Sequence, residues 1–163
     1  MNMNKKSNMT RSGAAKADES EYLSLRLGSE EYAIGILQVQ EIRSFEEPTR
    51  MVNAPPFVKG VINLRGVIVP IVDLRLKLNL QSADYTEFTV VIILKVHGTV
   101  IGVVVDSVSD VVSIKTDAIK PAPQFESVVE SRFITGLVHL GDRTLIVMNI
   151  EALLNHAELG MIR

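Results

Sequence analysis

The chain has 163 residues, which is enough for one ordinary domain that buries its core without disulfides or structural metals. It contains no cysteine, which excludes disulfides and thiolate chemistry. Hydrophobic residues make up 47% of the chain and aromatic residues only 5%, so Val, Ile and Leu dominate, as is typical of β-structure. Seventeen Lys and Arg against 19 Asp and Glu give a formal net charge of -2, and this balance disfavours nucleic-acid binding.

The first 20 residues differ in character from the rest. Residues 1–20 are polar, of mixed charge, and lack the apolar segment of a signal peptide. We expect a flexible tail there, followed by one domain over residues 21–163 with a link between its halves near residues 81–87. No apolar run approaches the roughly 20 residues that span a bilayer, so we expect a cytoplasmic protein with no direct membrane insertion.

Short strands and turns fill the beginning of the domain. Leucines alternate with polar residues over 22–27, which predicts a strand with the leucines on one face, and a turn over 28–31 precedes a partner strand that begins at Tyr32. Residues 36–45 are ambiguous but suit a strand, on which Val39, Glu41 and Arg43 share one face.

A hairpin and a helix complete the first half. Residues 57–64 and 67–72 predict two strands around the turn Arg65-Gly66, and residues 74–80 predict a short helix. Pro70 lies within the second strand and cannot donate a ladder hydrogen bond, so we expect it at a bulge or on an edge strand.

The second half repeats this plan. Strands are predicted over 88–96, 100–105 and 108–114, and residues 133–140 echo residues 57–64 without a gap before a second hairpin and helix. Weaker echoes relate residues 33–36 to 100–103 and residues 39–42 to 108–111. This duplication favours two small barrels, mainly β with short helices. Chance self-similarity between strands rich in Val and Ile is the alternative.

The residues that could support catalysis are scattered. The histidines, His97, His139 and His156, have no metal-ligand spacing, and no phosphate-binding loop or nucleophile motif is present. Three aspartates follow apolar runs, where turn-capping is the expected role: Asp73, Asp106 and Asp110. A small hydrolase or ligand-binding barrel that uses these groups is the weaker hypothesis. A generic SH3-like peptide binder would need an aromatic groove, and the chain has no Trp.

Binding to a partner protein is the stronger hypothesis. Arg65 places a planar, permanently charged guanidinium at a hairpin tip, beside Gly66, which allows close approach of another backbone. Val39, Glu41 and Arg43 would lie on an edge strand, where charges can set the register of a partner. In the alternative interpretation, Arg65 is a solvated turn residue and Glu41 is a charge that blocks indiscriminate strand pairing. The residues alone favour neither interpretation.

Several motifs resemble the CheW family of chemotaxis coupling proteins, and the resemblance covers the chain from about Glu21 to the C-terminus. The motifs span residues 39–43, 63–75, 102–111, 121–123, 141–143 and 149–154. The most specific is Asn-Leu-Arg-Gly, at residues 63–66, followed by the run from Val69 to Leu74. The resemblance implies two five-stranded SH3-like barrels around a shared hydrophobic core, with no catalytic activity.

The family resemblance also implies partners. It points to a non-catalytic adaptor, without cofactor or metal, that couples the cytoplasmic tips of methyl-accepting chemoreceptors to the regulatory domain of the histidine kinase CheA. Such an adaptor would cluster with receptor arrays at the inner face of the membrane. The groove between the barrels would receive the receptor tip, and the barrel ends would contact the kinase.

The same resemblance assigns residues to partner binding. Glu41, Gly60 and Arg65 match positions tied to coupling, and Lys120 and Phe125 match a second kinase contact, where Lys in place of the usual Arg loses the planar fork. The remaining residues assigned to partner binding flank these positions or line the seam: Val39, Ile42, Asn63, Gly66 and Val111.

Overall fold

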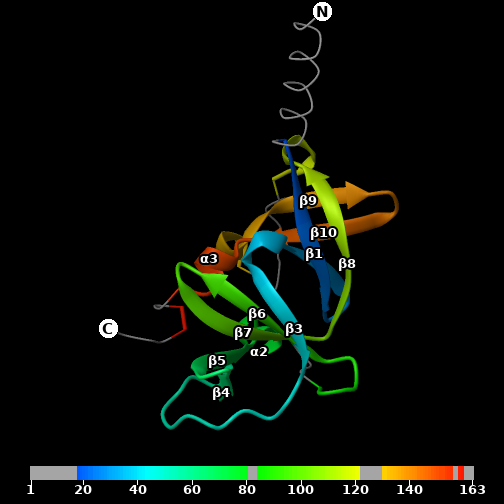
Figure 1. The fold of residues 1–163 in the computed structure, drawn as a ribbon. Helices are drawn as coiled ribbons and strands as arrows, with labels where there is room; N and C mark the ends of the chain where they lie inside the picture. The colour runs from blue at the N-terminus through cyan, green and yellow to red at the C-terminus, as the bar shows by residue number, and fades with distance from the viewer. Residues whose placement is uncertain (1–17, 81–83, 122–129, 156–157, 160–163) are drawn as a thin grey trace, which may run out of the picture.

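The computed structural model describes residues 18–80, 84–121, 130–155 and 158–159. Over these residues the chain forms two five-stranded sheets joined by short loops and a few one-turn helices (Figure 1). The predicted fold class is confirmed: the protein is mainly β, and the two sheets fit two SH3-like subdomains.

Sheet A has the strand order β8-β1-β2-β10-β9 and occupies the upper half of Figure 1. All neighbours are antiparallel except β10 and β2, which are parallel. Its strands are β1 (Glu19–Leu27), β2 (Glu30–Gly35), β8 (Ser107–Lys115), β9 (Ile134–Leu140) and β10 (Arg143–Met148).

Sheet B has the order β3-β6-β7-β5-β4 and lies in the lower half of Figure 1. Its one parallel pair is β5 with β7. Its strands are β3 (Val39–Ser44), β4 (Val58–Leu64), β5 (Val67–Asp73), β6 (Val90–Val96) and β7 (Thr99–Val105). The short helices are η1 (Ile36–Gln38), α2 (Leu74–Lys77), η2 (Thr116–Ala118), η3 (Ser131–Phe133) and α3 (Ile150–Leu153).

The two halves of the sequence exchange strands. The first five strands correspond in order to the last five, yet β1 and β2 lie in sheet A with β8, β9 and β10, whereas β6 and β7 lie in sheet B. Ile71, two residues before the cap of α2, pairs with Gly102, and Val147, two residues before the cap of α3, pairs with Ala33. Gly102 therefore corresponds to Ala33, and the sequence echo that matched it to Gly35 was wrong.

Three apolar clusters hold the molecule together. The largest is shared by the two sheets and includes Leu25 and Ile34 from sheet A with Ile92 and Val103 from sheet B. A smaller cluster around Ile93 belongs to sheet B, and another, around Leu145, belongs to sheet A. Each subdomain therefore has a small apolar cluster of its own, and the largest cluster is a core that both sheets share.

Some predicted boundaries need correction. The prediction of a flexible tail up to residue 20 is wrong for Glu19 and Ser20, which pair with β8, and residues 1–17 lie outside the described residues. The strand predicted from Phe88 begins at Val90, and Phe88 is 66% exposed. Pro70 is on neither an edge strand nor a bulge; β5 has neighbours on both sides, but its pairing with β7 starts only at Ile71. The proline therefore disrupts no ladder hydrogen bond on that side.

Candidate functional site

A tight turn presents the guanidinium of Arg65. Arg65 and Gly66 connect β4 to β5 with φ values of 51° and 88°, so both adopt the left-handed conformation of a two-residue hairpin turn. The Asn63 carboxamide oxygen accepts a hydrogen bond from the Gly66 N–H at 2.8 Å and holds the turn closed. The Asn-Leu-Arg-Gly motif thus stabilises the turn and fixes the backbone position from which the Arg65 side chain extends.

Arg65 forms an ion pair with Glu41 across sheet B. Its Nη2 lies 2.5 Å from Glu41 Oε2, and Arg43 Nη1 lies 3.1 Å from Glu41 Oε1. These two hydrogen bonds, first that from Arg65 and then that from Arg43, hold the pKa of Glu41 below its usual value. The prediction that β3 is an edge strand is confirmed, and Glu41 and Arg43 share one face. The prediction that Val39 shares that face is wrong, because a register shift between Val39 and Glu41 turns Val39 towards the shared core.

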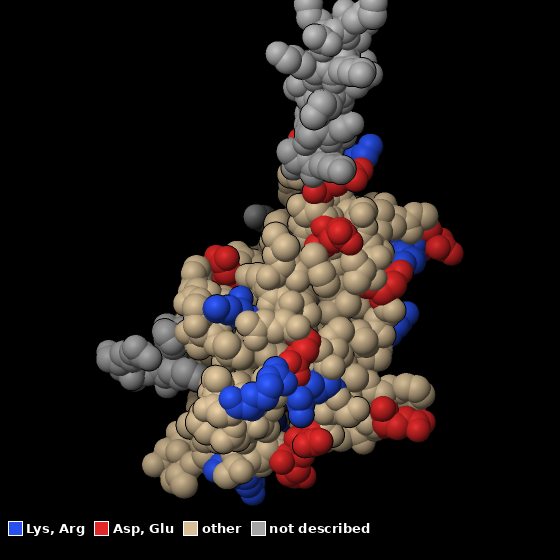
Figure 2. Space-filling view, in the orientation of Figure 1, with Lys and Arg blue, Asp and Glu red and all other residues tan. Residues whose placement is uncertain are grey.

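The strand and hairpin that carry this cluster, Glu41–Arg43–Arg65, also carry exposed apolar side chains. Ile42 on β3 is 43% exposed, and Val67 and Ile68 follow the turn with 51% and 61% exposed. The face shown in Figure 2 carries basic and acidic groups side by side, with wide uncharged areas between them. Arg is enriched at protein interfaces, and exposed apolar side chains on the same elements add apolar area that a partner could cover.

Sheet A carries a corresponding cluster that the sequence did not predict. Asp110 on β8 accepts hydrogen bonds from Ser24 at 2.5 Å and from Arg143 Nη2 at 3.0 Å, and Arg143 also reaches Glu31 at 2.7 Å. The hydrogen bonds from Arg143 and then Ser24 lower the pKa of Asp110. Asp110 was expected to cap a turn, but it lies within a strand and bonds to side chains of two other strands.

The two clusters occupy equivalent places. In each sheet an acid on one edge strand, β3 or β8, pairs with an arginine of the hairpin that supplies the other edge strand, β4 or β9. Each acid is at a register shift: Glu41 follows one that begins at Val39 in β3, and Asp110 lies within one, opposite Ser24, in β8. The arginines are not equivalent residues, since Arg65 is in its turn and Arg143 is the first residue of β10.

The predicted site residues do not form one surface. Val39, Glu41, Ile42, Asn63, Arg65 and Gly66 lie on β3 or the β4–β5 hairpin of sheet B. Val111, 50% exposed, is on β8 of sheet A. Lys120 pairs with Leu137 of β9, and its Nζ donates to the Asp117 carbonyl at 3.1 Å. Phe125 lies outside the described residues.

Gly60 contacts its own chain. A β-carbon there would lie 2.1 Å from the Thr49 carbonyl oxygen, and its φ of 145° is one that other residues rarely adopt. Thr49 bonds across to Val61 through both backbone groups, at 2.9 and 2.8 Å. Gly60 therefore provides the space for the segment at Thr49 to pair alongside β4, which is a structural role.

The carboxylates considered for catalysis are occupied. Asp73 is fully buried, and its oxygens accept hydrogen bonds from Arg75 and from the Tyr85 hydroxyl at 2.7 Å. Asp106 accepts from the same guanidinium at 2.8 Å and from the Gly28 N–H at 2.7 Å. Asp73 also caps α2, as predicted, by accepting from the Arg75 N–H. The arrangement closes a buried network and presents no free acid or base.

The structure also bears on metals and membranes. Among the described residues, no group of three or more His, Asp or Glu side chains could hold a metal ion. His139 lies on β9 and contacts Thr144, His97 forms an ion pair with Glu151 at 3.3 Å, and His156 is outside the described residues. In the part of the chain described, no helix has the length and apolar character needed to cross a bilayer.

Comparison with known proteins gives a consistent result. The model of the CheW-like domain family matches residues 21–158. The chemotaxis protein CheW of Klebsiella aerogenes is 51% identical over 142 residues, which are 87% of this chain and 86% of that protein. The CheW of Bacillus subtilis is 34% identical over 129 residues, covering 79% of this chain and 83% of that protein.

A solved structure agrees with the fold. The crystal structure of the scaffolding protein TtCheW from Thermoanaerobacter tengcongensis superposes with a TM-score of 0.76 at 26% identity. The match covers 83% of this chain and 88% of that one.

Proposed function

The chain belongs to the CheW-like domain family of chemotaxis scaffold proteins, and on this premise we propose that it is a non-catalytic adaptor that couples chemoreceptor tips to the histidine kinase CheA. The observation that carries the proposal is the family match over residues 21–158, which spans both sheets and the cluster Glu41–Arg43–Arg65. The adaptor would act in the cytoplasm, beside receptor arrays at the inner face of the membrane.

The architecture supports an adaptor because it offers more than one surface. The exposed charge pair and apolar side chains of sheet B are one candidate surface, Val111 on the edge of sheet A is a second, and the segment of Lys120 is a third. We assign the edge strands β3 and β8 to the receptor tip and the Lys120 segment to the kinase regulatory domain. Phe125 is assigned to the same kinase contact from the sequence.

The occupied carboxylates favour an adaptor over a hydrolase. A general acid or base needs a proton-transfer partner within reach of a substrate. Asp73 is enclosed by Arg75 and Tyr85, and Asp106 is committed to Arg75 and the turn at Gly28. These contacts leave the aspartates in structural roles, which supports binding without turnover.

The proposal is tested by reconstituting the complex from the full chain, a fragment of a chemoreceptor cytoplasmic tip and the kinase regulatory domain. Sedimentation should show each binary complex and a ternary complex. Each binary affinity should be modest, since an array gains strength from many linked contacts. A chain that binds one partner only, or whose binding to one excludes the other, would rule out coupling.

A further inference from the structure

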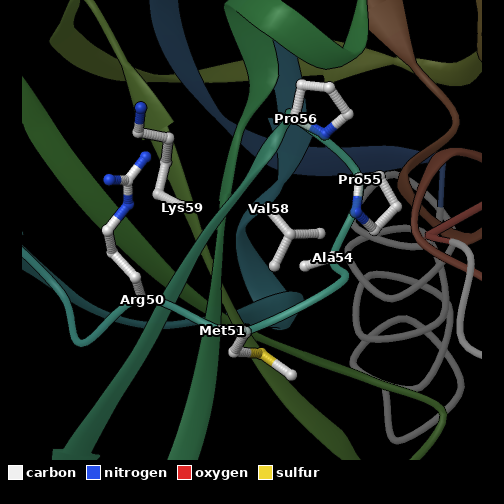
Figure 3. A pocket seen from close by; sticks show the side chains of 7 residues that line it. All are labelled: Arg50, Met51, Ala54, Pro55, Pro56, Val58 and Lys59. Carbon is white, nitrogen blue, oxygen red and sulfur yellow. The ribbon is translucent and has the colours of Figure 1, made fainter.

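A hollow beside β4 combines positive charge with apolar side chains. It has a volume of about 130 Å³ and lies between the start of β4 and the preceding loop. In Figure 3, Arg50 and Lys59 extend in the same direction on one side, and Met51, Ala54 and Val58 are on the other. Pro55 and Pro56 form the far wall, and their fixed φ angles keep it rigid.

Among the described residues, neither cation has an acidic partner. Within residues 18–80, 84–121, 130–155 and 158–159, no carboxylate lies within 4.0 Å of Arg50 or Lys59, whereas five other arginines each pair with a carboxylate: Arg43, Arg65, Arg75, Arg132 and Arg143. Two unpaired positive groups on one hollow repel each other, and an anion between them would relieve this repulsion. Neighbouring Met51 is 47% exposed and Val52 is 87% exposed, so apolar surface adjoins the charges.

The two cations are held by the buried network and by Gly60. Lys59 Nζ lies 5.6 Å from the centre of the Tyr85 ring, and the Tyr85 hydroxyl is fixed by Asp73. Arg50 directly follows Thr49, which is bonded to β4, and its Cα would lie 3.2 Å from a β-carbon on Gly60. These contacts fix the backbone at Arg50 and place the Lys59 ammonium beside Tyr85, while the Arg50 side chain is exposed and reachable.

We propose that this hollow receives an acidic side chain of a partner segment, with the carboxylate between Arg50 and Lys59 and an adjoining aliphatic side chain against Met51. Charge complementarity selects an acidic segment, and the exposed side chains of Met51 and Val52 beside the hollow favour a peptide with an aliphatic neighbour over a small anion. The inference deepens the proposed function and rests on it, because it adds a contact to one of the same two partners. Gly60 contributes as a positioning residue that acts through Thr49 and Arg50.

The test measures binding of the full chain to the receptor-tip fragment and to the kinase regulatory domain by calorimetry, at several salt concentrations. The double variant Arg50→Glu/Lys59→Glu is compared with Arg26→Glu/Lys95→Glu, which changes the charge equally at an exposed arginine and an exposed lysine outside the hollow and outside the surfaces assigned to the partners. We expect the first pair to weaken one of the two complexes about tenfold and to flatten its salt dependence. The control pair should leave both affinities within about twofold.

Each outcome is decisive. If the hollow variant melts like the wild type and binds both partners with unchanged affinity and salt dependence, the proposed site is wrong, while the adaptor function stands. A wild-type chain that binds neither fragment overturns the adaptor function and this site with it. If the reversed charges prevent folding, Arg50→Gln and Lys59→Gln are measured singly, and each should weaken the same complex about threefold; unchanged binding overturns the site.

Discussion

Glu41 and Arg65 join one edge of sheet B to the hairpin that forms the other edge. Glu41 is on β3 and Arg65 is in the turn after β4, and the two strands are the outer members of the sheet. The carboxylate is only 27% exposed, whereas the guanidinium is 69% exposed. The pair thus has an inward acid, fixed by Arg43 as well, and an outward cation that a partner can still reach.

Reversing the charge of Arg65 should impair binding more than folding. Arg65→Glu places two carboxylates together at the turn, but an exposed ion pair contributes only about 0.2–1 kcal/mol to the free energy of unfolding. We expect a melting temperature within about 5 °C of wild type and at least a tenfold loss of affinity for the receptor-tip fragment. Calorimetry measures the affinity, and circular dichroism during heating measures the melting temperature. Normal complex formation by a normally melting variant would remove Arg65 from the interface.

A charge swap separates the internal role of the pair from direct contact with a partner. In Glu41→Arg/Arg65→Glu the ion pair can form in reverse, so stability should recover by several tenths of a kcal/mol relative to Arg65→Glu. If Arg65 contacts the partner itself, affinity should stay low despite the recovered stability. Full recovery of affinity would instead show that the ion pair acts only within the protein, by joining β3 to the β4–β5 hairpin.

The cluster on sheet A should affect stability in acid. The pKa of Asp110 is lowered in the folded state by Arg143 and then Ser24, so its contribution is present above the unfolded pKa of about 3.9 and is lost as pH falls through the folded value. Asp110→Asn should therefore lower the unfolding free energy at pH 7 but make little difference near pH 2. Urea titrations at both pH values measure this. The control is Asp142→Asn, which removes an exposed acid from the β9–β10 hairpin, next to Arg143. An equal deficit for Asp110→Asn at pH 2 and pH 7 would contradict the linkage.

Alternating patterns predicted the strands well but could not predict how they exchange. The leucines of β1 were expected on one face, and Leu23, Leu25 and Leu27 all lie in the shared core. The parallel pairing of β5 with β7 connects residues about thirty positions apart, and no local pattern encodes it. The misplaced echo at Gly35 shows the same limit, because a short Ile-Gly match carries no register.

The candidate site was partly visible in the sequence. Glu41 and Arg65 were both singled out, and the structure brings them together. Ser24 and Arg143 gave no usable signal. Ser24 occupies a polar position between the leucines of an alternating strand, yet it is fully buried and bonded to Asp110 and Arg143. Side-chain networks that join distant strands depend on topology, which the pattern of a single strand does not contain.

The buried guanidinium of Arg75 should be essential for stability. It is fully buried, and although burial alone would lower its pKa, hydrogen bonds to Asp73 and Asp106 outweigh this and raise it. Arg75→Ala would leave the Asp73 carboxylate buried without its partner, at a cost of about 3–5 kcal/mol in the free energy of unfolding. Denaturant titration measures the loss. Asp73→Asn/Arg75→Met removes both charges and should recover part of it; if the double variant is less stable than Arg75→Ala, an unpaired charge is not the cause.

Three glycines allow the energetic cost of backbone strain to be compared with the cost of steric overlap. Gly60 has a φ of 145° and the Thr49 carbonyl oxygen 2.1 Å from the position of a β-carbon, whereas Gly136 meets the Lys120 carbonyl oxygen at 2.4 Å without a left-handed φ. Gly98, with a φ of 77° and nothing within 4 Å, has strain alone.

Replacing each glycine by alanine should therefore give graded effects. Gly98→Ala should cost about 1 kcal/mol, Gly136→Ala about 2 kcal/mol, and Gly60→Ala more than either, because strain and overlap act together. Urea titration of the three variants measures the order. Gly60→Ala should also weaken the complex that depends on Arg50, since relief of the overlap moves Thr49 and the arginine that follows it. A Gly60→Ala chain with full stability would mean that the Thr49 segment can shift freely, and Gly60 would then have no positioning role.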